Sequence, residues 1–114
     1  MKFEELRVWE LSSELYDKIN KIFNKQSYKE TFFRDQMLRA TLSISNNIAK
    51  WFERETNNEL KRFLYIAKWS CWEVRSMLKI AMKTWNIKQE IFDELHSICT
   101  HISVMLYKYI QTLK

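Results

Sequence analysis

The chain has 114 residues, 46% of them hydrophobic, and a net charge of +5, which suits a single folded domain, residues 1–114, with one core. It contains neither glycine nor proline. Because tight β-hairpins, glycine-rich phosphate loops and dinucleotide-binding turns depend on these residues, the composition argues against all three and favours long helices with short connections.

Helix-start patterns divide the chain into four segments. A capping residue followed three positions later by an acid or amide occurs at Ser27, Thr56 and Asn86. With the amphipathic N-terminal segment, these patterns predict helices over residues 3–24, 30–54, 58–85 and 88–113. Because short links join antiparallel neighbours, we predict an all-α fold, an antiparallel up-down-up-down four-helix bundle.

Apolar residues spaced three and four apart mark the inward face of each expected helix. In the first helix this stripe is Val8, Leu11, Leu15, Ile19 and Ile22. In the last helix it is Ile91, Leu95, Ile98, Ile102, Met105, Tyr109 and Leu113.

Five further apolar residues lie outside the stripes of the first two helices: Trp9, Tyr16, Phe23, Leu38 and Leu42. A monomeric bundle needs one stripe per helix, so a second strip predicts a surface for self-association. The alternative is that wide stripes bury these residues within a single bundle.

The third expected helix carries most of the excess positive charge. Five cations fall within a sector of about 80°, at about 100° per residue, on the side away from the core stripe, namely Lys61, Lys68, Arg75, Lys79 and Lys83. Tyr65 and Trp72 lie in the same sector. Cations that neutralise phosphates and rings that stack on bases are typical of nucleic-acid binding. The alternative is a solvated helix face with its aromatic rings buried at a subunit contact.

Catalytic and metal chemistry find little support in the sequence. His96 and His101 are five residues apart and do not share a helical face, and His96 with Cys99 makes too few ligands for zinc. Two cysteines, Cys71 and Cys99, are too few for a disulfide framework, and we expect both to be free, buried thiols. We expect a non-enzymatic protein without cofactor, metal or membrane span, located in the cytoplasm.

Three stretches resemble the bacterial four-helix bundle family, the intervening-sequence proteins encoded within some large-subunit ribosomal RNA genes. They are "FEELRVWELSSELYDKI", "QMLRATLSISNNIAKWFER" and "ELKRFLYIAKWSCWEVRSML". The chain also resembles a relative of that family, the accessory variability determinant of diversity-generating retroelements. That resemblance implies a pentamer of bundles that binds nucleic acid and the reverse transcriptase of the element.

The family pattern also points to particular residues of the second helix. Arg39 and Arg54 match arginines of the pattern, and Lys50 stands where relatives tend to carry an acid. Trp51 and Trp69 stand where relatives tend to carry small residues. We therefore add Arg39, Lys50 and Arg54 to the candidate nucleic-acid-binding residues.

Taken with the resemblance, the sequence predicts a homo-oligomer, a pentamer, that binds RNA or DNA as an accessory to a retroelement reverse transcriptase. The alternative is a structural or protein-interaction oligomer of the intervening-sequence type with no role on nucleic acid.

Overall fold

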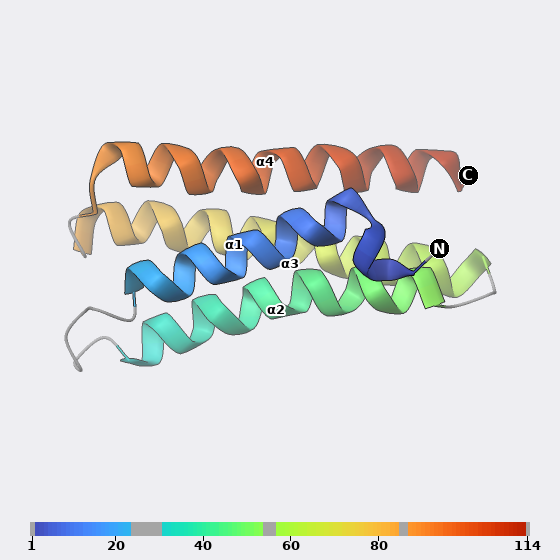
Figure 1. The fold of residues 1–114 in the computed structure, drawn as a ribbon, viewed down its shortest axis with the longest axis horizontal. Helices are drawn as coiled ribbons and strands as arrows, with labels where there is room; N and C mark the ends of the chain where they lie inside the picture. The colour runs from blue at the N-terminus through green and yellow to red at the C-terminus, as the bar shows by residue number, and fades with distance from the viewer. Residues whose placement is uncertain (1, 24–30, 54–56, 85–86, 114) are drawn as a thin grey trace.

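Four helices pack side by side along one long axis (Figure 1). The computed structural model describes residues 2–23, 31–53, 57–84 and 87–113. A short 3-10 helix, η1 (Phe3–Glu5), precedes α1 (Arg7–Phe23), α2 (Thr31–Glu53), α3 (Asn57–Thr84) and α4 (Gln89–Thr112). Each α-helix contacts the next in the chain, and α4 contacts α1, so the four close into a ring. The predicted all-α four-helix bundle is confirmed.

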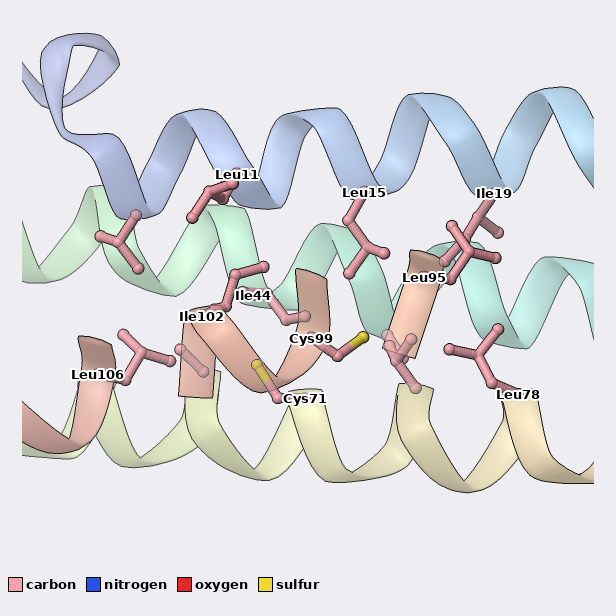
Figure 2. Close-up of a cluster of buried hydrophobic side chains, with 14 of the residues drawn as sticks. Leu11, Leu15, Ile19, Ile44, Cys71, Leu78, Leu95, Cys99, Ile102 and Leu106 are labelled. Atoms are coloured by element: carbon pink, nitrogen blue, oxygen red, sulfur yellow. The ribbon is translucent and has the colours of Figure 1, made fainter. Parts of the chain in front are cut away.

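Aliphatic side chains from all four helices fill the interior. Figure 2 shows Leu15 of α1, Ile44 of α2, Leu78 of α3 and Ile102 of α4 within one cluster, and all four are fully buried. Each such burial stabilises the fold by about 1.5–3 kcal/mol. This core holds the outer faces of α3 and α4 in a fixed relation to each other.

Buried serine hydroxyls cross the bundle between helices. Ser45 of α2 donates from Oγ to Oγ of Ser12 in α1 at 2.8 Å, and Ser12 donates to the carbonyl oxygen of Trp9 at 2.7 Å. Toward α3, Oγ of Ser70 donates to Oγ of Ser43 at 2.9 Å. Small side chains at these positions allow the backbones to approach, and each buried hydroxyl has a partner, so the layer carries little desolvation penalty.

The first helix begins later than predicted. Residues Phe3–Glu5 form η1, and Leu6 follows with an extended backbone, φ −74° and ψ 128°, before α1 starts at Arg7. This break turns Leu6 into the core and places the Phe3 ring against the Trp9 ring, with centroids 5.4 Å apart. The burial of Leu6 and the contact between Phe3 and Trp9 therefore outweigh the continuation of α1 back to Phe3.

Asn86, the predicted cap of the last helix, lies outside the described residues. The N-cap of α4 is Lys88, which has no side-chain capping bond, and the Gln89 amide donates to a carboxylate oxygen of Asp93 at 2.8 Å instead. The other two predicted caps, Ser27 and Thr56, also lie outside the described residues.

The inward face of α4 is also rotated relative to the predicted stripe. Leu95 and Ile102 are buried as expected, but the remaining buried positions are Phe92, Cys99, Ser103, Leu106 and Ile110. The predicted Ile91, Ile98, Met105, Tyr109 and Leu113 are half-buried and pack against the edge of the core. This rotation turns the flank of α4 that carries His96 and Tyr107 from solvent toward α3, where Tyr107 meets Lys68.

Candidate nucleic-acid interface

A lysine held by two aromatic rings lies where α3 meets α4. The Lys68 ammonium lies over the Trp72 ring at 5.8 Å and over the Tyr107 ring at 5.0 Å, measured to the ring centroids. Both rings are 51% exposed. Cation–π attraction fixes the ammonium without using its N–H donors, and the exposed ring surface remains open to a ligand.

A cationic pocket of about 340 Å³ lies next to this lysine and is lined by Trp72, Arg75, Ser76, Lys79 and His96. The Lys79 ammonium lies over the Phe92 ring at 4.9 Å from its centroid. The His96 ring stacks on the same phenylalanine, with centroids 5.3 Å apart and planes at 28°. Phe92 thus positions two polar side chains while leaving their hydrogen-bonding atoms unused.

Arg75 is one of the two half-buried residues that line the pocket. Its Nε is buried and has no hydrogen-bond partner among the described residues. None of the ion pairs between described residues involves Arg75 or Lys79. A buried guanidinium N–H normally has an acceptor, so this atom is an unmet donor beside a solvent-open pocket.

Burial and nearby cations both act on the pKa of His96. Burial lowers the pKa of His96, and the charges of Arg75 and Lys79 lower this pKa further, while Asp93 opposes the change. The imidazole therefore favours its neutral form as long as no anion is nearby. An anion in the pocket would relieve that repulsion.

We name the α3–α4 seam as the surface formed by Lys68, Trp72, Arg75 and Lys79 of α3 and His96 and Tyr107 of α4. The basic row, expected on the side away from the core, is less exposed than that expectation implies, since three of its five members are half-buried. Lys68 and Arg75 are half-buried against α4, because α4 packs beside this sector of α3. Lys79 and Lys83 are exposed, and Lys61 is half-buried.

His96 and Tyr107 are functional candidates that reasoning from one helix at a time missed. They lie on α4 and join the seam only through helix packing, so no spacing in the sequence connects them to Arg75 or Lys68. The one available signal was polar or aromatic character on a helix otherwise rich in aliphatic residues.

The candidates on α2 lie apart from the seam. Arg39 and Lys50 are exposed on α2, and the Lys50 ammonium lies 6.0 Å from the Phe63 ring centroid of α3. Neither residue lines the cationic pocket. Arg54 lies outside the described residues.

Phe23, one of the five predicted self-association residues, belongs to the core. Its side chain is fully buried within the single chain. It follows Ile19 by four residues and thus continues the inward stripe of α1, whereas the expected Ile22 is only half-buried. The prediction that Phe23 faces a partner subunit is wrong.

Three of the other four predicted self-association residues line a groove between α1 and α2. Trp9, Tyr16 and Leu42 line a hollow of about 240 Å³, where Trp9 is partly covered by Phe3. Leu42 is 43% exposed, and Leu38 packs half-buried against the core. An apolar edge therefore remains on this side of the bundle.

Thiol and metal chemistry have no visible support in the described residues. Cys71 and Cys99 are free and buried, and burial raises the pKa of Cys71 and raises that of Cys99 to about 12. Within the described ranges, no three His, Cys, Asp or Glu side chains are placed to hold a metal ion. None of the helices, over the residues placed, is long and apolar enough to cross a membrane.

Comparison with known proteins identifies the family of the chain. The family described as 23S rRNA-intervening sequence protein matches residues 4–108. A solved structure, a protein with unknown function from the S23 ribosomal protein family of Bacteroides thetaiotaomicron, superposes with a TM-score of 0.83 at 22% identity, covering 91% of this chain and 95% of that one. No curated protein matches. At 22% identity the solved structure supports the fold alone. The match over residues 4–108 shows that this chain belongs to the 23S rRNA-intervening sequence protein family.

Proposed function

We propose that this protein is a non-enzymatic, self-associating nucleic-acid-binding protein that contacts RNA or DNA through the α3–α4 seam. The observation that carries the proposal is the placement of Lys68 over two half-exposed rings, directly beside a cationic pocket. Phosphate neutralisation and base stacking are the two interactions that single-stranded nucleic acid offers to a protein, and the seam presents groups for both.

The length of the basic row suits a short run of nucleic acid. Lys61 and Lys83 are 22 residues apart in α3, which corresponds to about 33 Å at 1.5 Å per residue. That distance matches about ten base pairs of duplex at 3.4 Å per step. The row can therefore follow a strand over several phosphates.

Self-association would multiply this contact. The apolar edge around Trp9, Tyr16 and Leu42 supports an oligomer, and the pentameric state follows from the sequence resemblance alone. Several copies of the row on one particle would add avidity to a weak single contact. Size exclusion coupled to light scattering should give several times 14.1 kDa, and a monomer at micromolar concentration would reject this part of the proposal.

A reverse transcriptase as partner rests on the same resemblance. It is tested by co-expression with a reverse transcriptase encoded next to the gene, followed by purification at two salt concentrations. If no such gene lies nearby, or if the two proteins do not co-purify, the accessory role is rejected. Nucleic-acid binding is then tested separately.

The central test compares two double charge reversals on the same bundle. Lys68→Glu with Lys79→Glu removes two seam cations, and Arg62→Glu with Lys108→Glu removes two cations that are exposed and do not line the pocket. Both changes alter the net charge equally. Arg75 is left unchanged here because it is half-buried with its Nε atom fully buried, and it is tested separately below.

Fluorescence anisotropy with labelled single-stranded RNA, single-stranded DNA and duplex DNA should show that the seam variant loses binding and the control variant retains most of it. Far-UV circular dichroism confirms that both variants are folded. Equal losses, or no binding by the wild type at low salt, would favour the structural or protein-interaction oligomer instead.

A further inference from the structure

The cationic pocket differs from the rest of the basic row because its donors converge from two helices. Arg75 and Lys79 come from α3 and His96 from α4, and Ser76 adds a hydroxyl. Of the three remaining row cations, Lys68 lies over the Trp72 and Tyr107 rings, and Lys61 and Lys83 lie toward the ends of α3. Convergent donors in a hollow are typical of a binding site for a discrete anion rather than of a diffuse charged face.

We propose that the pocket of Trp72, Arg75, Ser76, Lys79 and His96 is a phosphate-binding subsite. The inference deepens the proposed function and rests on it in one respect, since it assigns the bound phosphate to a nucleic-acid strand. Trp72 forms one wall of the pocket, so a nucleotide whose phosphate is held by Arg75 lies within reach of that ring.

The unmet donor of Arg75 is the first argument for a ligand. Its Nε is buried without a partner in the described part of the chain. An unsatisfied buried donor costs about 1–3 kcal/mol, and an acceptor that draws the guanidinium out into the pocket would remove that cost. Guanidinium groups bind phosphate oxygens through two parallel N–H bonds, so an oxyanion suits this donor better than a halide does.

Preorganisation by Phe92 is the second argument. The ring fixes the Lys79 ammonium at 4.9 Å and stacks the His96 ring at 5.3 Å. Neither contact consumes an N–H donor, so both side chains keep their hydrogen-bonding capacity while losing conformational freedom. A ligand therefore meets side chains that are already ordered, and binding costs less entropy.

The nearest acid does not fill the pocket. Asp93 is exposed on α4, and its Oδ1 accepts a hydrogen bond from the Gln89 amide at 2.8 Å. Asp93 is the acid whose charge acts on His96, yet it does not line the pocket. Since no carboxylate of the described residues pairs with Arg75 or Lys79, the pocket is open to an anion from outside.

Inorganic phosphate is the first probe. In a proton NMR titration at constant ionic strength, the His96 C2 proton should shift saturably with added phosphate, and the signal of His101, exposed on the same helix, should not. Chloride in place of phosphate should leave His96 unmoved. A shift of both histidines alike, or an equal response to chloride, would overturn a specific phosphate site.

Oligonucleotides that carry a 5′-phosphate or a 5′-hydroxyl distinguish the source of the phosphate group. Tighter binding of the phosphorylated strand assigns the pocket to a terminal phosphate, and equal binding assigns it to an internal phosphodiester. The variant is Arg75→Gln, with Arg62→Gln as the matched control, since each removes one cation from α3 and Arg62 lies outside the pocket.

We expect Arg75→Gln to weaken oligonucleotide binding about 10-fold or more, as loss of a hydrogen bond to a charged group does, and Arg62→Gln to weaken it only slightly. Arg75→Lys keeps the charge but loses the planar guanidinium that can bind two phosphate oxygens. It should therefore lower the affinity for oligonucleotides while leaving the salt dependence of binding unchanged. It also provides a folded variant if Arg75→Gln unfolds, as a thermal melt will show.

The outcomes separate the two proposals. If strands bind and both glutamine variants lose affinity equally, the subsite is overturned and the interface stands. If no strand binds but phosphate moves His96, the pocket binds phosphate and the nucleic-acid function is overturned.

Discussion

Replacing Trp72 by alanine separates ring stacking from charge at the α3–α4 seam. Trp72 is 51% exposed, so truncation removes little core packing, and Lys68 keeps its contact with Tyr107 at 5.0 Å. A base that stacks on the lost ring contributes about 1–3 kcal/mol. Dissociation constants for single strands should therefore rise about 5- to 150-fold.

Salt dependence shows which interaction was lost. With about four phosphate contacts per protomer, the log–log slope for B-DNA should be near −3.6. Trp72→Ala removes no charge and should leave the slope unchanged. Lys79→Gln removes one cation and should reduce the slope by about 0.9 for duplex and about 0.7 for single strands.

Fluorescence anisotropy over a series of salt concentrations measures both quantities in one experiment. Trp69→Ala is the matched control, because Trp69 is 52% exposed on the same helix and does not line the pocket. Unchanged single-strand affinity in Trp72→Ala, together with a changed mass in light scattering, would refute the stacking argument and assign the ring to a subunit contact.

Three further outcomes follow from burial. Phe23→Ala should lower the free energy of unfolding by about 3–5 kcal/mol in a urea titration, equally at two protein concentrations, and a loss below about 1 kcal/mol would return Phe23 to an interface role. The pKa of His96 is lowered on folding, so the unfolded chain takes up a proton first as the pH falls. The free energy of unfolding should therefore decrease as the pH drops below about 6.5. His96→Gln should weaken this dependence, and a variant with an unchanged pH profile would contradict the lowered pKa of His96. Burial raises the thiol pKa of Cys71 and Cys99, so an aromatic disulfide reagent should label them only on unfolding, and rapid labelling of the folded protein would disagree.

The architecture was predictable because it depends on local periodicity. The stripe of Val8, Leu11, Leu15 and Ile19 is buried as expected, since apolar residues on one helical face allow only one inward orientation. In α4 apolar residues occupy neighbouring positions, as at Phe92 beside Ile91, so periodicity alone could not choose between two faces. Packing against α1 and α3 decided between them.

The seam was predictable only in part. The row from Lys61 to Lys83 is visible as a spacing, but its partner on α4, Tyr107, joins through tertiary packing. The burial of Arg75 likewise depends on how closely α4 approaches α3, which no single-helix pattern encodes. The sequence thus indicated a charged face, and the three-dimensional arrangement added a pocket to it.

The hydrogen bonds that link Ser12 to Ser45 and Ser43 to Ser70 fix the axial register of the helices in the bundle. Layers of leucine and isoleucine repeat along each helix, so sliding one helix past its neighbour by a turn would exchange one aliphatic layer for another of similar shape. Such a slip moves a hydroxyl by about 5.4 Å, beyond hydrogen-bonding distance, and leaves it unpaired among hydrocarbon. Because α2 carries a hydroxyl toward each neighbour, it sets the axial position of α1 and α3 at once, and substitutions elsewhere in the aliphatic layers cannot shift that alignment without breaking a bond.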